Sequence, residues 1–168
     1  GSDTITGSAG NDAIDGGAGA DIAVFTGPRS GYTINFNTPG AGQTQIQDNT
    51  ANRDGTDTLT GVEILQFSDA YYVIASGTSG SPINLTGLGF NGGVPIKVLT
   101  GTNDDFLTIG QGLSNRSIDL GAGLGDTITL GITGGYNLNL VNVENLNGTG
   151  GDDFVSLVAN ASGLTIDL

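Results

Sequence analysis

The chain has 168 residues, a formal net charge of −13, 31 glycines, four basic residues and no Cys, Met, Trp or His. Four basic residues cannot neutralise a phosphate backbone, which excludes nucleic acid as a partner and argues against an anionic membrane surface. The absence of Cys and His removes disulfides, zinc–thiolate sites and the commonest general base, and leaves hard oxygen ligands, which suit calcium.

The first elements are two consecutive nonapeptides, residues 7–15 and 16–24, and both fit the pattern G-G-x-G-x-D-x-U-x, where U is a large aliphatic residue. Residues 1–6 supply the end of a third copy. Glycines at positions one, two and four let the backbone turn around an ion, and the Asp at position six adds a carboxylate. Calcium takes six to eight oxygens, more than one such loop offers, so an ion must be shared between stacked loops. The predicted calcium-binding residues of this stretch are Asp3, Gly7, Gly10, Asp12, Gly16, Gly19 and Asp21.

The period of the repeat also predicts where these residues lie. If each nonapeptide is a turn plus a short strand, successive turns fall on alternate sides of a flattened coil. Asp3 and Asp21 should then share one edge and ligate one ion, while Asp12 lies at the other edge. The aliphatic position carries Ile5, Ile14 and Ala23, which should point into the core. The stretch resembles the hemolysin-type (RTX) calcium-binding repeat of bacterial secreted proteins.

After Val24 the nonapeptide phase fails, so we expect the roll to end there. Residues 32–36 and 43–47 alternate in polarity around a Pro/Gly-containing turn, which predicts an antiparallel hairpin that covers the end of the roll. Residues 55–60 fit positions four to nine of the repeat and make Asp57 a further candidate ligand. Residues 61–67 and 71–74 read as two strands. The RTX resemblance covers roughly residues 1–75.

A Ser/Gly-rich stretch at 76–82 reads as a linker between a domain at 1–75 and a second region at 83–168. In the second region, residues 102–109 match 150–157, and residues 117–120 match 165–168. Both pairs of segments have the same spacing and so define a 48-residue repeat. The fold class expected is all-β: a parallel β-roll capped by a hairpin, followed by a second β-solenoid or β-sandwich-like half.

The second region also holds candidate ligands. Asp126 follows a glycine turn, and Gly150 and Asp152 fit the nonapeptide with Asp152 at position six and Phe154 at the core position. Asp104 fits less well. The alternative is that these aspartates cap turns. The glutamates of two similar segments, Val62–Leu65 and Val143–Leu146, are expected to be exposed on strands.

We expect no enzymatic activity. The adjacent pairs Asp104–Asp105 and Asp152–Asp153 suggest a glycosidase at first sight, but neighbours on a strand point to opposite faces and cannot converge on one substrate atom. There is no phosphate-binding G-x-x-x-x-G-K-[ST] loop and no G-x-S-x-G nucleophile elbow. No apolar run reaches the ~18 residues of a membrane span.

The functional expectation is therefore a calcium-binding module that folds on binding calcium. The resemblance implies type I secretion of an unfolded chain from a Gram-negative bacterium and folding outside the cell. One hypothesis is a structural piece of an S-layer or adhesin. The alternative is a non-catalytic secretion and folding module of a larger enzyme such as a protease or lipase. Calcium ions are the expected partner, with self-association or a cell-surface partner as further alternatives. Because residues 165–168 repeat 117–120, we also expect the parent chain to continue with a glycine turn after Leu168.

Overall fold

The computed structural model describes residues 1–168 except 75–78, 91–92, 100–102, 111–112, 114–115 and 158–162. The described part contains short strands, turns and 3-10 conformation but no α-helix, which confirms the all-β prediction. The chain packs as two compact units, Gly1–Ile74 (unit 1) and Ala75–Leu168 (unit 2). The predicted linker at 76–82 falls partly outside the described residues, and the predicted domain limits stay a prediction.

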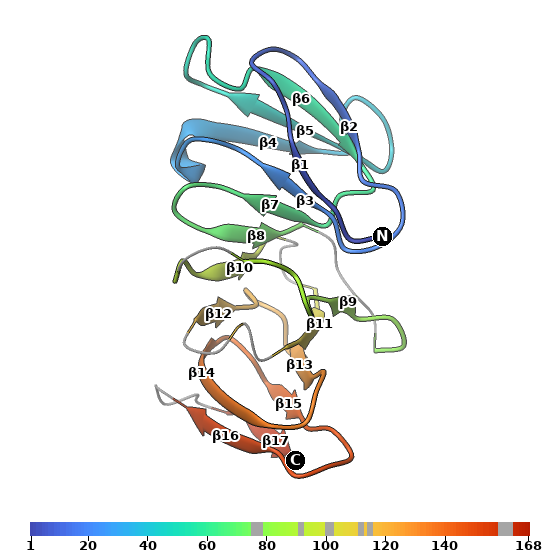
Figure 1. The fold of residues 1–168 in the computed structure, drawn as a ribbon, viewed down its shortest axis with the longest axis vertical. Coiled ribbons are helices and arrows are strands. Elements are labelled where there is room, and N and C mark those ends of the chain that lie inside the picture. Colours follow the sequence, from blue (N-terminus) through green and yellow to red (C-terminus); the bar gives the residue numbers. More distant parts are fainter. Residues whose placement is uncertain (75–78, 91–92, 100–102, 111–112, 114–115, 158–162) are drawn as a thin grey trace. The chain divides into compact units, whose positions relative to one another are not determined.

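Unit 1 begins with three nonapeptide strands, β1 (Thr4–Thr6), β2 (Ala13–Asp15) and β3 (Ile22–Val24). β1 pairs in parallel with β3, with Thr4 opposite Ile22, whereas β2 belongs to a second sheet (Figure 1). A full coil of the roll therefore consists of two nonapeptides, and the glycine turns alternate between its two edges, as the repeat predicts.

The roll does not end at Val24, and that expectation was wrong. β6 (Thr56–Thr60) pairs in parallel with β2, and β7 (Ile64–Gln66) pairs in parallel with β3. Residues 56–66 thus form the next coil, and residues 25–55 are an insertion between coils. The phase of the repeat is lost in the sequence because the insertion, and not the end of the roll, follows β3.

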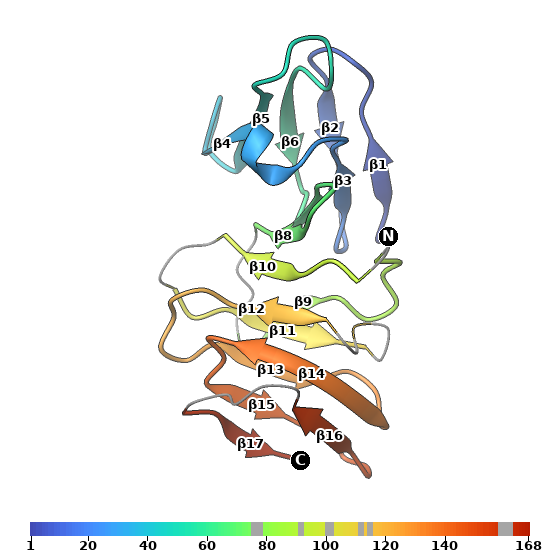
Figure 2. The ribbon, with the colours of Figure 1, turned by 90° about the vertical axis from the view of Figure 1, so that its left-hand side faces the viewer.

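The insertion contains the predicted hairpin of β4 (Tyr32–Phe36) and β5 (Gln43–Asp48), which pair antiparallel with Ile34 opposite Ile46. A 3-10 turn, η1 (Arg29–Gly31), precedes it. β5 pairs with β6, so the sheet order is β2-β6-β5-β4 and the hairpin caps this sheet (Figure 2). In the other sheet, β8 (Tyr71–Val73) pairs antiparallel with β7.

The core of unit 1 lies between the two sheets. Ile14 and Ala23 are buried and Ile5 packs against them, which confirms the inward aliphatic positions. The insertion adds aromatic rings to this core. The Phe25 ring stacks on Phe67, which follows β7, with centroids 5.4 Å apart, and Tyr32 packs beside them. The insertion therefore extends the narrow core that the small nonapeptide side chains would otherwise leave poor in apolar surface.

An ion pair fixes the loop that leads from the hairpin back to the roll. Arg53 donates to both carboxylate oxygens of Asp48 at 2.6 Å, and its guanidinium lies 4.7 Å from the centre of the Tyr32 ring. The Arg53 hydrogen bonds lower the pKa of Asp48 to about 2. The Tyr32 hydroxyl donates to Asp54, and burial together with this carboxylate raises the pKa of Tyr32 to about 12. These contacts fix the position of the loop that precedes Asp57 in the chain.

Unit 2 is a solenoid, not a sandwich, because every strand pairing described within it is parallel. One sheet runs β10-β12-β14-β16 and the other β17-β15-β13-β11-β9 (Figure 1). A coil spans two nonapeptide lengths where Thr127 lies opposite Asn145, and it is somewhat longer where Ile96 lies opposite Ile118. The strands are β9 (Ile83–Asn84), β10 (Ile96–Val98), β11 (Phe106–Ile109), β12 (Ser117–Asp119), β13 (Thr127–Leu130), β14 (Gly135–Val141), β15 (Asn145–Asn147), β16 (Phe154–Leu157) and β17 (Thr165–Asp167).

The 48-residue repeat is not the structural unit of this solenoid. It relates β11 to β16 and β12 to β17, and the two strands of each pair lie in opposite sheets. The expected core position of Phe154 was also wrong, since its side chain is 72% exposed and Val155 is half-buried. Because side chains alternate along a strand, the inward set of β16 is shifted by one residue from the predicted phase.

Candidate calcium-binding edges

One edge of unit 1 carries a ladder of carboxylates, which we call the Asp21 edge (residues 1–3, 16–21 and 61–63). The Asp3 backbone N–H donates to Asp21 Oδ1 at 2.7 Å, and the Asp21 N–H donates to Glu63 Oε2 at 2.9 Å. Each carboxylate thus reaches the backbone of the preceding coil. The structure places Asp3 beside Asp21, at the same edge, as predicted from the period of the repeat.

Asp21 is the centre of this ladder. Its side chain is 0% exposed, and Oδ2 has no hydrogen-bond partner. A buried carboxylate oxygen without a partner costs free energy unless a cation or a proton satisfies it. The backbone around it is tightly packed: a Cβ on Gly16 would lie 2.2 Å from Gly61 O, and one on Gly19 (φ +137°) would lie 2.6 Å from Gly1 O. Carbonyl oxygens of neighbouring coils therefore lie against the glycine loop.

The opposite edge of unit 1, the Asp12 edge, consists of residues 7–12 and 52–57. The Asp12 N–H donates to Asp57 Oδ1 at 2.9 Å, and Asp12 Oδ2 accepts from the Ser8 N–H at 2.8 Å. A Cβ on Gly55 (φ +86°) would lie 2.0 Å from Gly10 O. The structure therefore brings Asp12 and Asp57 together, with the loop of Gly7 and Gly10 beside them.

Burial changes the acidity of this edge. The Asp57 side chain is 2% exposed, and burial, with the nearby Asp12 charge as a smaller cause, raises the pKa of Asp57 to about 6. The same main cause raises the pKa of Glu63 at the Asp21 edge. Carboxylates that are buried beside other carboxylates favour either a proton or a cation.

The two glutamates that we expected to be exposed are half-buried members of these edges, which corrects the sequence interpretation. Glu63 receives the N–H of Asp21, and Glu144 receives the N–H of Asp126. The sequence signal for this role was the similarity between Val62–Leu65 and Val143–Leu146. In both segments the glutamate accepts an aspartate N–H.

Unit 2 contains an edge of the same form, the Asp126 edge (residues 103–105, 123–126 and 144). The Asp105 N–H donates to Asp126 Oδ1 at 2.7 Å, and the Asp126 N–H donates to Glu144 Oε2 at 3.0 Å. Asp126 is 0% exposed, and its Oδ2 has no hydrogen-bond partner. Burial is the main cause that raises the pKa of Asp126.

The turn at residues 148–153 is in a different phase from the one predicted. The Thr149 N–H donates to Asp153 Oδ2 at 2.6 Å, as the Ser8 N–H does to Asp12 Oδ2. Asp153 therefore takes the place of Asp12, while Asp152 is exposed. Gly150 then corresponds to Ala9, and a Cβ on Gly150 would meet nothing within 4 Å.

Asp104 caps a turn, which is the alternative that the sequence left open. Its Oδ1 accepts from the N–H groups of Leu124 at 3.1 Å and Gly125 at 2.9 Å. The side chain is exposed, whereas its neighbour Asp105 is 1% exposed. The adjacent acids of this pair therefore lie in different environments.

The donor set fits calcium if backbone carbonyls take part. Among the residues that the structure describes, no three acidic, His or Cys side chains are grouped so as to hold a metal by themselves. Calcium accepts a mixture of carboxylate and carbonyl oxygens. The glycine loops bring carbonyls of adjacent coils against the loop of Asp21, and at the Asp12 edge Gly10 O lies against Gly55. The unpartnered Asp21 Oδ2 is the oxygen that such an ion would satisfy.

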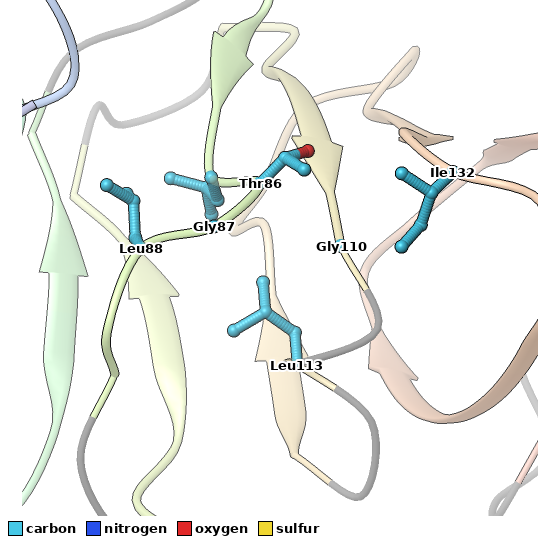
Figure 3. Close-up of a pocket in the computed structure, with 7 residues that line it drawn as sticks. Thr86, Gly87, Leu88, Gly110, Leu113 and Ile132 are labelled. Atoms are coloured by element: carbon cyan, nitrogen blue, oxygen red, sulfur yellow. The ribbon is translucent and has the colours of Figure 1, made fainter.

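Unit 2 also has an apolar hollow, which is lined by none of these carboxylates. It has a volume of about 280 Å³ and is lined by Leu85, Thr86, Gly87, Leu88, Gly110, Leu113 and Ile132 (Figure 3). None of these lining residues is titratable, so the hollow brings no acid, base or charged ligand to a substrate. We assign no function to it.

Comparison with known proteins gives one match. Residues 1–23 match the family described as RTX calcium-binding nonapeptide repeat (4 copies). This stretch contains Asp3, Asp12 and Asp21 with their glycine loops. No curated protein and no solved structure matches the chain. Within the described residues, no helix has the length and apolar character needed to cross a membrane.

Proposed function

Because residues 1–23 carry RTX calcium-binding nonapeptide repeats, we propose that this chain is a calcium-binding structural module. Calcium ions bind at its glycine-loop edges and hold adjacent coils together. The observation that carries the proposal is Asp21, a fully buried carboxylate between the glycine loops of adjacent coils, with one oxygen that has no partner. Asp3, Asp12, Asp57 and the loops of Gly7, Gly10, Gly16 and Gly19 are the further proposed ligands. In the turn at residues 148–153, we propose Asp153 as the ligand instead of Asp152 and Gly150, because Asp153 takes the place that Asp12 has in the first nonapeptide.

Calcium acts on folding through charge. Like-charged carboxylates about 5 Å apart repel by about 0.8 kcal/mol per pair even in water, and burial makes each charge more costly. The side chains of the nonapeptide coils are small, so little apolar burial offsets this repulsion. A calcium ion turns repulsion into attraction at each edge, and its binding free energy then appears as folding free energy.

RTX repeats are typical of secreted bacterial proteins, which supports a location outside the cell. There we propose a structural role in a large surface protein of the S-layer or adhesin type, secreted unfolded by a type I system of a Gram-negative bacterium. The solenoid form of both units supports this role, since parallel coils stack into a rigid body. The same calcium chemistry would serve the alternative, a secretion and folding module of a larger enzyme.

We propose no catalytic role for the chain itself. The matched repeat is a calcium-binding structural type. Of the paired acids, Asp104 caps the turn at Leu124 and Gly125, whereas Asp105 is buried. They do not face one substrate.

Calorimetric titration of the full chain with CaCl₂, and separately with MgCl₂, tests this function. We expect calcium to bind with a dissociation constant of about 10⁻⁴ to 10⁻³ M, in the range of extracellular modules. Magnesium should bind much more weakly, because it demands a compact octahedral set and gives up its water reluctantly. Equal binding of the two ions, or no calcium binding at millimolar concentration, would contradict the proposal.

A further inference from the structure

We infer that unit 2 holds a calcium site of its own, built on Asp126 and closed by Glu144, outside the segment that matches the RTX repeat. The inference rests on the calcium chemistry proposed for unit 1. It names a second place, far along the chain from the matched residues 1–23, where the same arrangement is rebuilt without the G-G-x-G-x-D spacing.

The first support is the repetition of one ladder in both units. In unit 1, the Asp3 N–H donates to the Asp21 carboxylate, and the Asp21 N–H donates to Glu63. In unit 2, Asp105, Asp126 and Glu144 make the same two bonds in the same order. In each ladder the backbone O of the central Asp also accepts two N–H groups from the coil of the glutamate.

The second support is the state of the central carboxylate. Asp126 is 0% exposed, and its Oδ2 has no hydrogen-bond partner, as for Asp21. Asp105 precedes it and Glu144 follows it along the same edge, so the unpartnered oxygen lies in an acidic environment. A divalent cation satisfies this oxygen and neutralises its neighbours at the same time.

The third support is the backbone of the loop. Asp104 holds the loop through the N–H groups of Leu124 and Gly125. A Cβ on Gly123 would lie 2.2 Å from Asp126 Oδ1 and 2.7 Å from Asn103 O. The glycine thus lets a carbonyl of the preceding coil approach the loop, as Gly19 does with Gly1 O in unit 1. The loop supplies carbonyl oxygen, and the two acids supply the charge.

The test counts calcium ions bound to the full chain by equilibrium dialysis, for the unchanged chain and for Asp126→Asn, Glu144→Gln and Asp152→Asn. Asn and Gln keep the oxygen that accepts the ladder N–H, so the substitutions remove charge with little change of shape. We expect Asp126→Asn to bind one ion fewer, and Glu144→Gln to bind that ion at least about tenfold more weakly. Asp152→Asn is the control, since it makes the same charge change at an exposed position of unit 2, and it should bind as the unchanged chain does.

Asp126→Asn with the full number of ions would overturn the inference, provided that Glu144→Gln is also unchanged. If Asp126→Asn does not fold, weaker binding of one ion in a folded Glu144→Gln chain supports the inference and unchanged binding overturns it. Failure of the proposed function looks different: the unchanged chain itself binds no calcium. Loss of ions in Asp21→Asn alone, with Asp126→Asn unaffected, leaves the proposed function intact and removes only the site in unit 2.

Discussion

Asp21→Asn is expected to weaken calcium binding at the Asp21 edge by at least about tenfold, which is about 1.4 kcal/mol of binding free energy. The amide keeps an oxygen that can accept the Asp3 N–H, so the ladder bond survives. It loses the negative charge at the buried oxygen that has no other partner. Without calcium, the substitution should not lower the free energy of unfolding, because a buried amide costs less than a buried charge. The variant should then be no less stable than the unchanged chain.

The matched control is Asp15→Asn. Asp15 lies in the same pair of nonapeptides, is exposed, and accepts the Gly17 N–H through an oxygen that Asn retains. Asp15→Asn removes the same charge from an exposed residue that is not one of the proposed ligands, so the effect of net charge on calcium binding is measured separately. Calcium titrations of the two variants followed by circular dichroism compare them. Equal midpoints for Asp21→Asn and Asp15→Asn would contradict the assignment of Asp21.

Gly16→Ala is expected to lower the free energy of unfolding of unit 1 by at least about 2 kcal/mol, even in saturating calcium. The new Cβ would lie 2.2 Å from Gly61 O and 2.7 Å from Asp21 Cβ. The first of these atoms belongs to the backbone of the next coil, so relief requires the coils to separate. Thermal or urea unfolding in calcium measures the change.

Gly150→Ala is the comparison for this substitution. Gly150 is exposed, a Cβ there meets nothing within 4 Å, and Ala9 already stands at the corresponding place of the first nonapeptide. We expect a change within about 0.5 kcal/mol, the usual range for surface positions. A loss as large as that of Gly16→Ala would show that the phase given to residues 148–153 is incorrect.

The sequence predicts the edges of unit 1 well because the information is local. A glycine turn in every nonapeptide fixes the coil, and the Asp at position six then falls at a known edge, as the pairing of β1 with β3 confirms. The hairpin was equally predictable from the sequence, since its turn joins strands that are adjacent in the chain. Both predictions depend on spacing and alternation alone.

The continuation of the roll was not predictable in this way. β2 pairs with β6 across the whole insertion, so the pairing of Ile14 with Leu59 depends on contacts that no local period records. The exposed Phe154 shows a second limit. A pattern of glycines and two adjacent aspartates fits the repeat in two phases. The hydrogen bond of Asp153 to Thr149 and the burial of Val155 relative to Phe154 separate them.

Glu63 and Glu144 show a third limit. A lone glutamate in a strand is ordinarily solvated, and nothing in the local sequence signals that its carboxylate reaches the backbone of an aspartate in the preceding coil. The similarity of the two segments around them was visible, but its meaning depends on the stacking of coils. With the two ladders known, the similarity of these segments identifies Glu63 and Glu144 as the last carboxylate of each ladder.

Far-UV circular dichroism of the full chain in calcium, after chelation, and after calcium is returned tests the central claim most directly, namely that calcium binding at the edges supplies the folding free energy. Carboxylate repulsion and poor apolar burial in the nonapeptide coils predict that chelation removes much of the β signal and that added calcium restores it. A β spectrum that is unchanged by chelation would contradict the claim, because the edges would then be stable without the ion.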